Sequence, residues 1–143
     1  MIRRLTKSLF ILLLIVGNFE LIHAEYISPG IQIGINSSKE FFYSYQLTFG
    51  LDLDAEYGLP GITLGRRHFK RDKKKWEAYN YIDVQLSLIA AGGGIGIIFN
   101  KSDVLSKYKL FTGYFGLLTY DYINFKDKPK NHFGAFGVFP LID

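Results

Sequence analysis

One stretch of the sequence decides the fold, and it reads Phe41-Phe42-Tyr43-Ser44-Tyr45-Gln46-Leu47-Thr48-Phe49-Gly50-Leu51-Asp52-Leu53-Asp54. Apolar and aromatic residues occupy the odd positions, and Ser, Gln, Thr, Gly and Asp occupy most of the even ones. Such period-two alternation predicts a β-strand with one apolar and one polar face. A strand of a soluble protein averages roughly 5–6 residues, so this one is unusually long.

A second stretch, residues 76–88, repeats the pattern. Its apolar face carries Trp76, Ala78, Asn80, Ile82, Val84, Leu86 and Leu88, and its polar face carries Glu77, Tyr79, Tyr81, Asp83, Gln85 and Ser87. Further strands are predicted over residues 30–36, 61–70, 94–100, 108–125 and 132–142. This makes seven strands, whereas a closed up-and-down antiparallel ring needs an even number. Either the long segment 108–125 hides a further strand, or the sheet is not a simple closed barrel.

The segments between these strands are rich in residues typical of turns. They cover residues 36–39, 54–60, 71–75, 91–94, 100–107 and 126–131. No amphipathic helix is predicted, and residues 104–110 have room for one helical turn at most. The run Gly92-Gly93-Gly94 lacks the Lys-Ser/Thr of a phosphate-binding loop and is interpreted as a hairpin turn with a bulge. Gly134 and Gly137 indicate close strand packing or curvature.

The N-terminal residues 1–24 have the layout of a secretory signal peptide. Arg3, Arg4 and Lys7 precede an apolar run over residues 9–16, and Ile22-His23-Ala24 lies where a signal peptidase would cut. An uncleaved membrane anchor is the alternative, although the run is shorter than the roughly 20 residues that span a bilayer as a helix. Residues 25–143 are then a single β-barrel domain.

The composition excludes several classes of function. The formal net charge of the 143 residues is +4, and half of it lies in the predicted signal peptide. The nearly neutral remainder is not the basic surface of a nucleic-acid-binding protein. With no cysteine, disulfides and thiolate chemistry are absent. The high content of Phe, Tyr and Gly favours strands with tight turns.

Long alternating strands occur in two settings. In an outer-membrane barrel the apolar face meets lipid, and in a soluble barrel or sandwich it forms the core. Strand length, a polar second face and aromatic residues near the strand ends (Phe41, Phe42, Tyr43, Trp76, Tyr79, Tyr120, Tyr122, Phe125) are typical of the membrane case.

With these features the chain resembles the small outer-membrane β-barrel proteins of Gram-negative bacteria. The resemblance is one of general pattern over residues 30–142, and it differs in the acidic end of Phe139-Pro140-Leu141-Ile142-Asp143, where that group usually ends on an aromatic residue. It implies an all-β, monomeric, up-and-down antiparallel barrel of about eight strands in the outer membrane. So small a lumen is filled by side chains, so we expect no porin-like pore.

A basic cluster is the candidate binding site. Its members are Arg66, Arg67, Lys70, Arg71, Lys73, Lys74 and Lys75. On such a barrel it forms a strand end and a turn on the cell exterior, where it is expected to bind phosphates of outer-membrane lipid, including those of lipopolysaccharide. A solvated turn that blocks aggregation is the alternative.

Catalysis and metal binding are not expected. No Gly-x-Ser-x-Gly motif occurs, and His23, His68 and His132 share no metal-ligand spacing. Asp52, Asp54, Glu77 and Asp83 are expected to pair inside the barrel with Arg66, His68 and Lys70. The expected function is therefore a non-enzymatic outer-membrane barrel with a structural, adhesive or lipid-interacting role and no cofactor. The alternative is a soluble periplasmic or secreted barrel or sandwich that binds a small apolar ligand or a partner protein.

Overall fold

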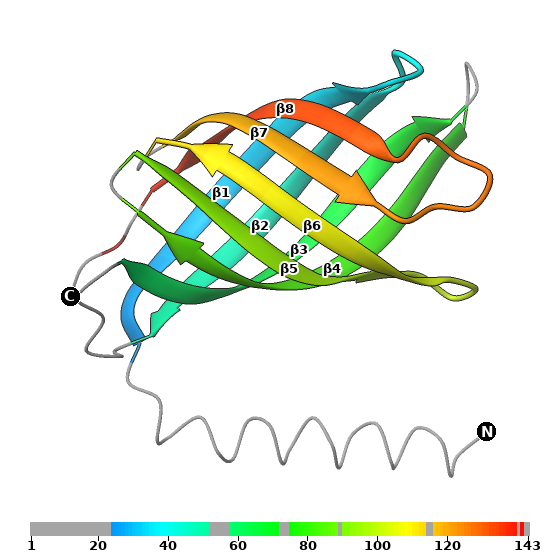
Figure 1. Cartoon of the computed structure of the whole chain (residues 1–143). Coiled ribbons are helices and arrows are strands. Elements are labelled where there is room, and N and C mark those ends of the chain that lie inside the picture. Colours follow the sequence, from blue (N-terminus) through cyan, green and yellow to red (C-terminus); the bar gives the residue numbers. More distant parts are fainter. Residues whose placement is uncertain are drawn as a thin grey trace, which may run out of the picture.

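The computed structural model describes residues 24–51, 58–71, 75–88, 90–113, 116–139 and 141. Within them the chain forms strands β1 (Ala24–Asn36), β2 (Phe41–Leu51), β3 (Leu59–Arg71), β4 (Lys75–Ser87), β5 (Ala91–Phe99), β6 (Val104–Thr112), β7 (Gly116–Ile123) and β8 (Asn131–Val138). Each strand pairs with the next, and β8 pairs antiparallel with β1, which closes the barrel (Figure 1). The predicted up-and-down antiparallel barrel of eight strands is confirmed. The predicted signal peptide lies outside the described residues, except for Ala24, which begins β1.

The strand missing from the sequence count lies in the segment 108–125. This segment contains the end of β6 and the whole of β7, separated at Gly113. Gly113 has a φ of 82°, a left-handed conformation that favours glycine and ends β6. Residues 104–107, expected to be a turn or one helical turn, belong to β6 instead, because their side chains alternate and Lys107 is buried inside the barrel.

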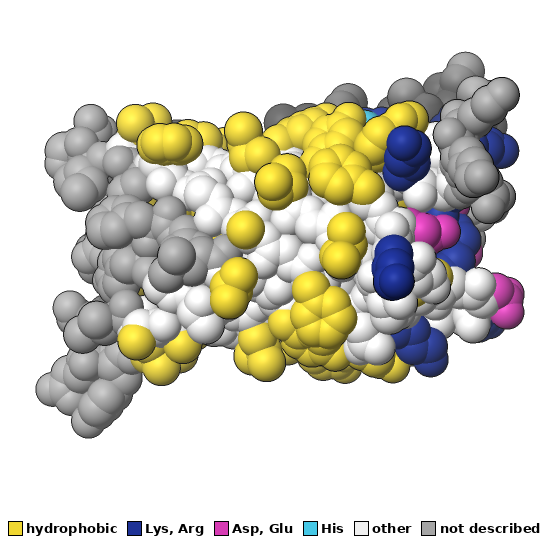
Figure 2. Space-filling view, turned by 90° about the horizontal axis from the view of Figure 1, so that it is seen from above, with side chains coloured by type: hydrophobic (Ala, Val, Ile, Leu, Met, Phe, Trp, Pro, Cys, Tyr) yellow, Lys and Arg dark blue, Asp and Glu magenta, His cyan; other side chains and the backbone are white. Residues whose placement is uncertain are grey.

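The barrel wall places mainly apolar side chains on its outer face and most of its polar side chains inside. On β2 the side chains of Phe42, Ser44, Gln46 and Thr48 are buried inside the barrel. Outward-facing side chains are mostly apolar, and Ile31, Val84 and Ile95 are 61%, 56% and 64% exposed. Figure 2 shows hydrophobic side chains spread over the middle of the wall. The alternation predicted for residues 41–54 and 76–88 is confirmed over residues 41–51 and 76–87, with the polar face inside, and residues 52–54 lie outside the described residues.

Charged residues gather at one end of the barrel. This end, called the charged end below, carries the connections β1–β2, β3–β4, β5–β6 and β7–β8, and the opposite end carries the start of β1 and the end of β8 (Figure 1). In Figure 2 the Lys, Arg, Asp and Glu side chains lie at the charged end, on the right of the view.

Aromatic rings fill the interior near the charged end. Phe69 is central, with ring centroids 6.1 Å from Phe42, 5.7 Å from Tyr79, 5.8 Å from Phe125 and 5.3 Å from His132. Phe42, Phe69, Tyr79 and Phe125 are almost fully buried. These packed rings supply the apolar core of the fold and occupy the lumen at this end.

The glycine run is part of a strand rather than a turn. Gly92, Gly93 and Gly94 lie in β5, and the amide of Leu88 donates to the carbonyl of Ala91 across the connection that precedes it. A Cβ on Gly92 would overlap the ring of Phe111. The run therefore makes room for the inward side chain of Phe111 on β6. The glycine content of the run alone predicted a turn, because it does not reveal this packing role.

Of the two glycines expected to pack closely on β8, one does so. Gly134 faces Gly34 of β1 in the register, and a Cβ on Gly134 would lie 2.5 Å from the carbonyl oxygen of Ile33. Gly137 has no atom within 4 Å of the position a Cβ would take, so close packing does not explain that glycine.

Candidate functional site

The interior of the barrel holds a buried ionic network. The guanidinium of Arg67 on β3 lies 2.6 Å from the carboxylate of Asp121 on β7, and both side chains are fully buried. Gln32 on β1 links them, because its Nε2 donates to Asp121 over 2.9 Å and its Oε1 accepts from Arg67 over 2.7 Å. The amide of Gln32 also donates to Thr119 over 2.6 Å. The network therefore joins three strands across the lumen.

Two lysines extend this network. Lys107 donates to Asp83 and lies 3.7 Å from the second oxygen of Asp121. Its ammonium also lies 4.4 Å from the centre of the Tyr81 ring. Lys109 is buried and sits between aromatic rings, with its ammonium 5.4 Å from the centroids of both Phe111 and Phe136. Most polar atoms of the network bind one another, although Nη1 of Arg67 and one carboxylate oxygen each of Asp83 and Asp121 form no hydrogen bond with the described residues. The network therefore holds opposite walls of the barrel together.

The prediction that the acidic residues pair with Arg66, His68 and Lys70 inside the barrel was wrong. Arg66, His68 and Lys70 share the outward face of β3, where Arg66 and Lys70 are exposed. The inward cations are Arg67 and Arg71 on the other face of the strand, so these and Lys107 are the partners of the acidic residues. Asp52 and Asp54 lie outside the described residues.

The basic cluster is divided between the two sides of the wall. Arg67 is buried on Asp121 and therefore cannot contribute to a surface binding site. Arg71 lies 2.8 Å from Glu40 and 3.0 Å from Glu77, so its charge is already paired. Arg66, Lys70 and Lys75 are exposed. Lys73 and Lys74 lie outside the described residues.

A second ion cluster closes the charged end around Glu77. Besides Arg71, Glu77 binds the ammonium of Lys128 over 2.6 Å, and Lys128 also donates to the hydroxyl of Tyr79 over 3.0 Å. Partial burial opposes the charge of Lys128, but the hydrogen bonds to Glu77 and Tyr79 outweigh it and raise the pKa of its ammonium above the ordinary value. The connection between β7 and β8 is thereby tied to the start of β4.

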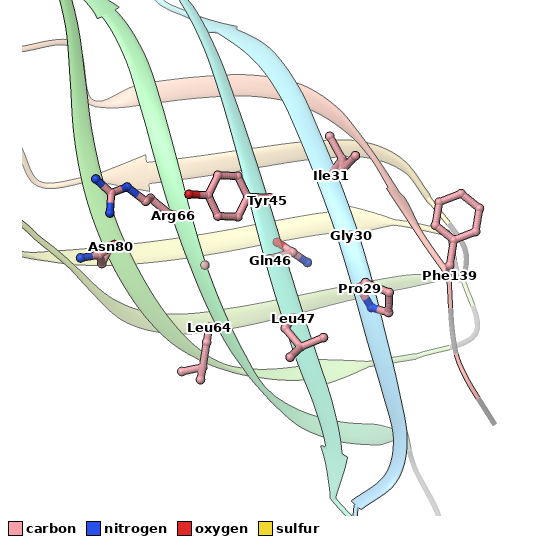
Figure 3. Close-up of a pocket in the computed structure, with 11 residues that line it drawn as sticks. Pro29, Gly30, Ile31, Tyr45, Gln46, Leu47, Leu64, Arg66, Asn80 and Phe139 are labelled. Carbon is pink, nitrogen blue, oxygen red and sulfur yellow. The ribbon is translucent and has the colours of Figure 1, made fainter. Parts of the chain in front are cut away.

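The outer wall carries a groove that the sequence did not predict. It has a volume of about 550 Å³ and lies over β1 to β4 (Figure 3). Its lining is mainly apolar, with Arg66, Asn80 and Tyr45 as its polar side chains at the surface: the lining residues are Pro29, Gly30, Ile31, Tyr45, Gln46, Leu47, Leu64, Gly65, Arg66, Asn80 and Phe139. Figure 3 shows the hydroxyl of Tyr45 directed toward Arg66. The signal in the sequence was the interruption of the apolar faces of β3 and β4 by Arg66 and Asn80.

The histidines do not form a metal centre in the described part of the chain. His68 stacks on Tyr43 with ring centroids 4.7 Å apart, and His132 is buried among the interior rings. In the described ranges no three residues of His, Cys, Asp or Glu are grouped so that they could hold a metal ion.

The chain matches no protein-family model, no curated protein and no solved structure closely enough to indicate a relative. The described residues include no helix that is long and apolar enough to cross a membrane.

Proposed function

We propose that this protein is a non-enzymatic outer-membrane β-barrel of the cell envelope with a structural, adhesive or lipid-interacting role. One observation carries the proposal: the closed barrel presents its apolar side chains outward and buries its polar side chains inside. Exposed apolar surface is costly in water, whereas in a bilayer the same surface contacts lipid hydrocarbon and is removed from water.

The dimensions of the barrel support this location. Its strands have 8 to 13 residues, and a strand that spans a bilayer needs roughly 9–11. All backbone donors of the wall can pair, because a closed sheet has no free edge.

Aromatic residues on the outer wall also support it. Phe41 and Tyr43 both pack against Trp76 near the charged end, with ring centroids 6.3 Å and 5.3 Å from that of Trp76. Tyr120 and Phe133 form a further outward pair at 5.3 Å. Such rings are typical of the zone where a membrane barrel meets the lipid headgroups.

A soluble barrel requires the opposite arrangement of the wall. Its core would consist of Ile31, Leu47, Val84 and their neighbours, which are exposed in this fold. The interior instead contains buried charges and amides beside closely packed aromatic rings, whereas a site for a small apolar ligand is lined mainly by apolar side chains around an open cavity.

Cell fractionation tests the proposal directly. The full-length chain is expressed in a Gram-negative host, membranes are separated, and the mobility of the protein on gels is compared with and without boiling. We expect recovery in the outer membrane and a band that shifts on boiling, because closed barrels resist detergent until heated. Recovery as a soluble periplasmic or secreted protein would overturn the proposal.

A further inference from the structure

The groove on the outer wall has the chemistry of a lipid site. We propose that it binds one acyl chain of lipopolysaccharide from the surrounding outer leaflet, with Arg66 holding a phosphate of the same molecule. This inference rests on the membrane location proposed above and adds a ligand and a binding residue to it.

The apolar lining of the groove fits a hydrocarbon chain. Its floor and walls are formed largely by the side chains of Pro29, Ile31, Leu47, Leu64 and Phe139. Ile31 is 61% exposed and Leu64 is 43% exposed, so no other described part of the chain covers them. An apolar hollow open to the outside of the wall is filled by an acyl chain without loss of any polar contact.

Arg66 supplies the charge complementarity. Among the outward-facing side chains that the structure describes, the charged ones are Arg66 and Lys70, both on β3. Arg66 forms no ion pair with any residue that the structure describes. An unpaired guanidinium on an apolar wall is unfavourable in a membrane unless an anion neutralises it. A phosphate meets this need, because guanidinium binds it through two parallel hydrogen bonds.

The neighbours of Arg66 complete a polar site at the head of the groove. In the sheet register Arg66 lies between Tyr45 on β2 and Asn80 on β4, whose hydroxyl and amide groups are further donors for phosphate oxygens (Figure 3). Lys70 lies on the same outward face nearer the charged end and is exposed, so it provides a second positive charge for the headgroup.

The position of the site along the barrel indicates which leaflet of the membrane supplies the bound lipid. Arg66 lies in the half of β3 that leads to the charged end, and Tyr45 beside it contacts His68 in the aromatic group of that end. If the termini of the barrel face the periplasm, the charged end faces the cell exterior. The lipid of that leaflet in a Gram-negative outer membrane is lipopolysaccharide, which carries both phosphates and acyl chains.

The test measures lipid bound to the full barrel in non-ionic detergent. Wild type, Arg66→Gln and Leu64→Trp are incubated with purified lipopolysaccharide, and binding is followed by native mass spectrometry. We expect one bound molecule in wild type and affinity at least about tenfold lower in Arg66→Gln, since a charged hydrogen-bond partner is lost. Leu64→Trp fills the groove and should weaken binding as well.

Two matched variants and a second lipid make the result decisive. Lys101→Gln removes an exposed charge from the β5–β6 connection, and Leu118→Trp enlarges an outward side chain of β7, so both should bind as wild type does. Wild-type binding by Arg66→Gln, or equal retention of phosphatidylglycerol, would overturn the inference. A heat-modifiable outer-membrane barrel that retains no lipopolysaccharide would overturn the inference but leave the proposed function standing, whereas a soluble protein would remove both.

Discussion

Arg67 and Asp121 form an ion pair across the lumen, with their side chains 2.6 Å apart and neither accessible to solvent. Arg67 belongs to β3 and Asp121 to β7, which lie on opposite sides of the closed barrel. Backbone hydrogen bonds join each strand only to its two neighbours. The pair therefore adds a direct connection between walls that the sheet itself does not link.

Replacing Asp121 with Asn should strongly destabilise the barrel. The change removes the buried carboxylate that pairs with Arg67, and it also removes the more distant of the two carboxylates near Lys107. Breaking a buried pair in this way costs about 3–5 kcal/mol. Urea unfolding of the detergent-solubilised barrel, followed by the gel mobility of the folded band, measures the loss. The double variant Arg67→Met with Asp121→Leu should recover much of it, because no unpaired charge of that pair remains. Unfolding of Asp121→Asn at the wild-type urea concentration would contradict this account.

Gly65 should not tolerate even a methyl group. Its Cβ would overlap the ring of Tyr81, which lies beside it in the register and donates its hydroxyl to Gln46 over 3.0 Å. Gly65→Ala should therefore lower the free energy of unfolding by about 1–3 kcal/mol, the usual cost of overpacking. Gly137→Ala is the matched control, because nothing lies within 4 Å of its added Cβ and stability should hardly change. Equal stability of the two variants in the same urea titration would show that the Tyr81 ring moves aside at no measurable cost in stability, contrary to this prediction.

The sequence predicted the strands well where the two faces differ in polarity. The alternation over residues 41–54 and 76–88 located β2 and β4 and separated their apolar from their polar faces, but by itself it left open which face lies inside the barrel. It failed for β6 and β7, where the long segment 108–125 appeared continuous. β6 ends at the left-handed conformation of Gly113, and glycines interspersed with aromatic residues give a weak turn signal.

The faces of β3 show why the candidate site was only partly predictable. Arg66 and Arg67 are adjacent in the sequence, yet one lies on the outer wall and the other is fully buried. The apolar Ile62 and Leu64 share the face of Arg66, so periodicity could have assigned Arg66 to the outside. The partner of Arg67 could not be found in this way, because Asp121 meets it across the lumen, where contacts depend on the closure of the barrel rather than on sequence spacing.

Lys39 in the β1–β2 turn should be sensitive to β-branched substitution. It has a φ of 61°, and the turn is held by Asn36, whose side-chain oxygen accepts from the amides of Ser38 and Glu40 at 3.0 Å each. Lys39→Val should lower the free energy of unfolding of the barrel by about 1–2 kcal/mol, because a β-branched side chain clashes with the backbone in the left-handed conformation. Lys39→Gly should be no less stable than wild type. Lys101→Val, in a connection without a positive φ at that residue, is the control; if both valine variants lost the same stability in urea, the backbone conformation would not be the cause.

Val84 tests whether the outer wall meets lipid. It is 56% exposed and lies in the register between Ile62 of β3 and Ile95 of β5, which also face outward. An arginine in the middle of a lipid-facing band costs about 2–4 kcal/mol, so Val84→Arg should sharply reduce the heat-modifiable barrel recovered from outer membranes. Leu47→Arg on β2 should behave in the same way. Ser38→Arg places the same charge in the exposed β1–β2 turn and should assemble as wild type does. In a protein surrounded by water, all three arginines would lie at the solvent surface, so normal assembly of Val84→Arg and Leu47→Arg would mean that the apolar wall is not in contact with lipid.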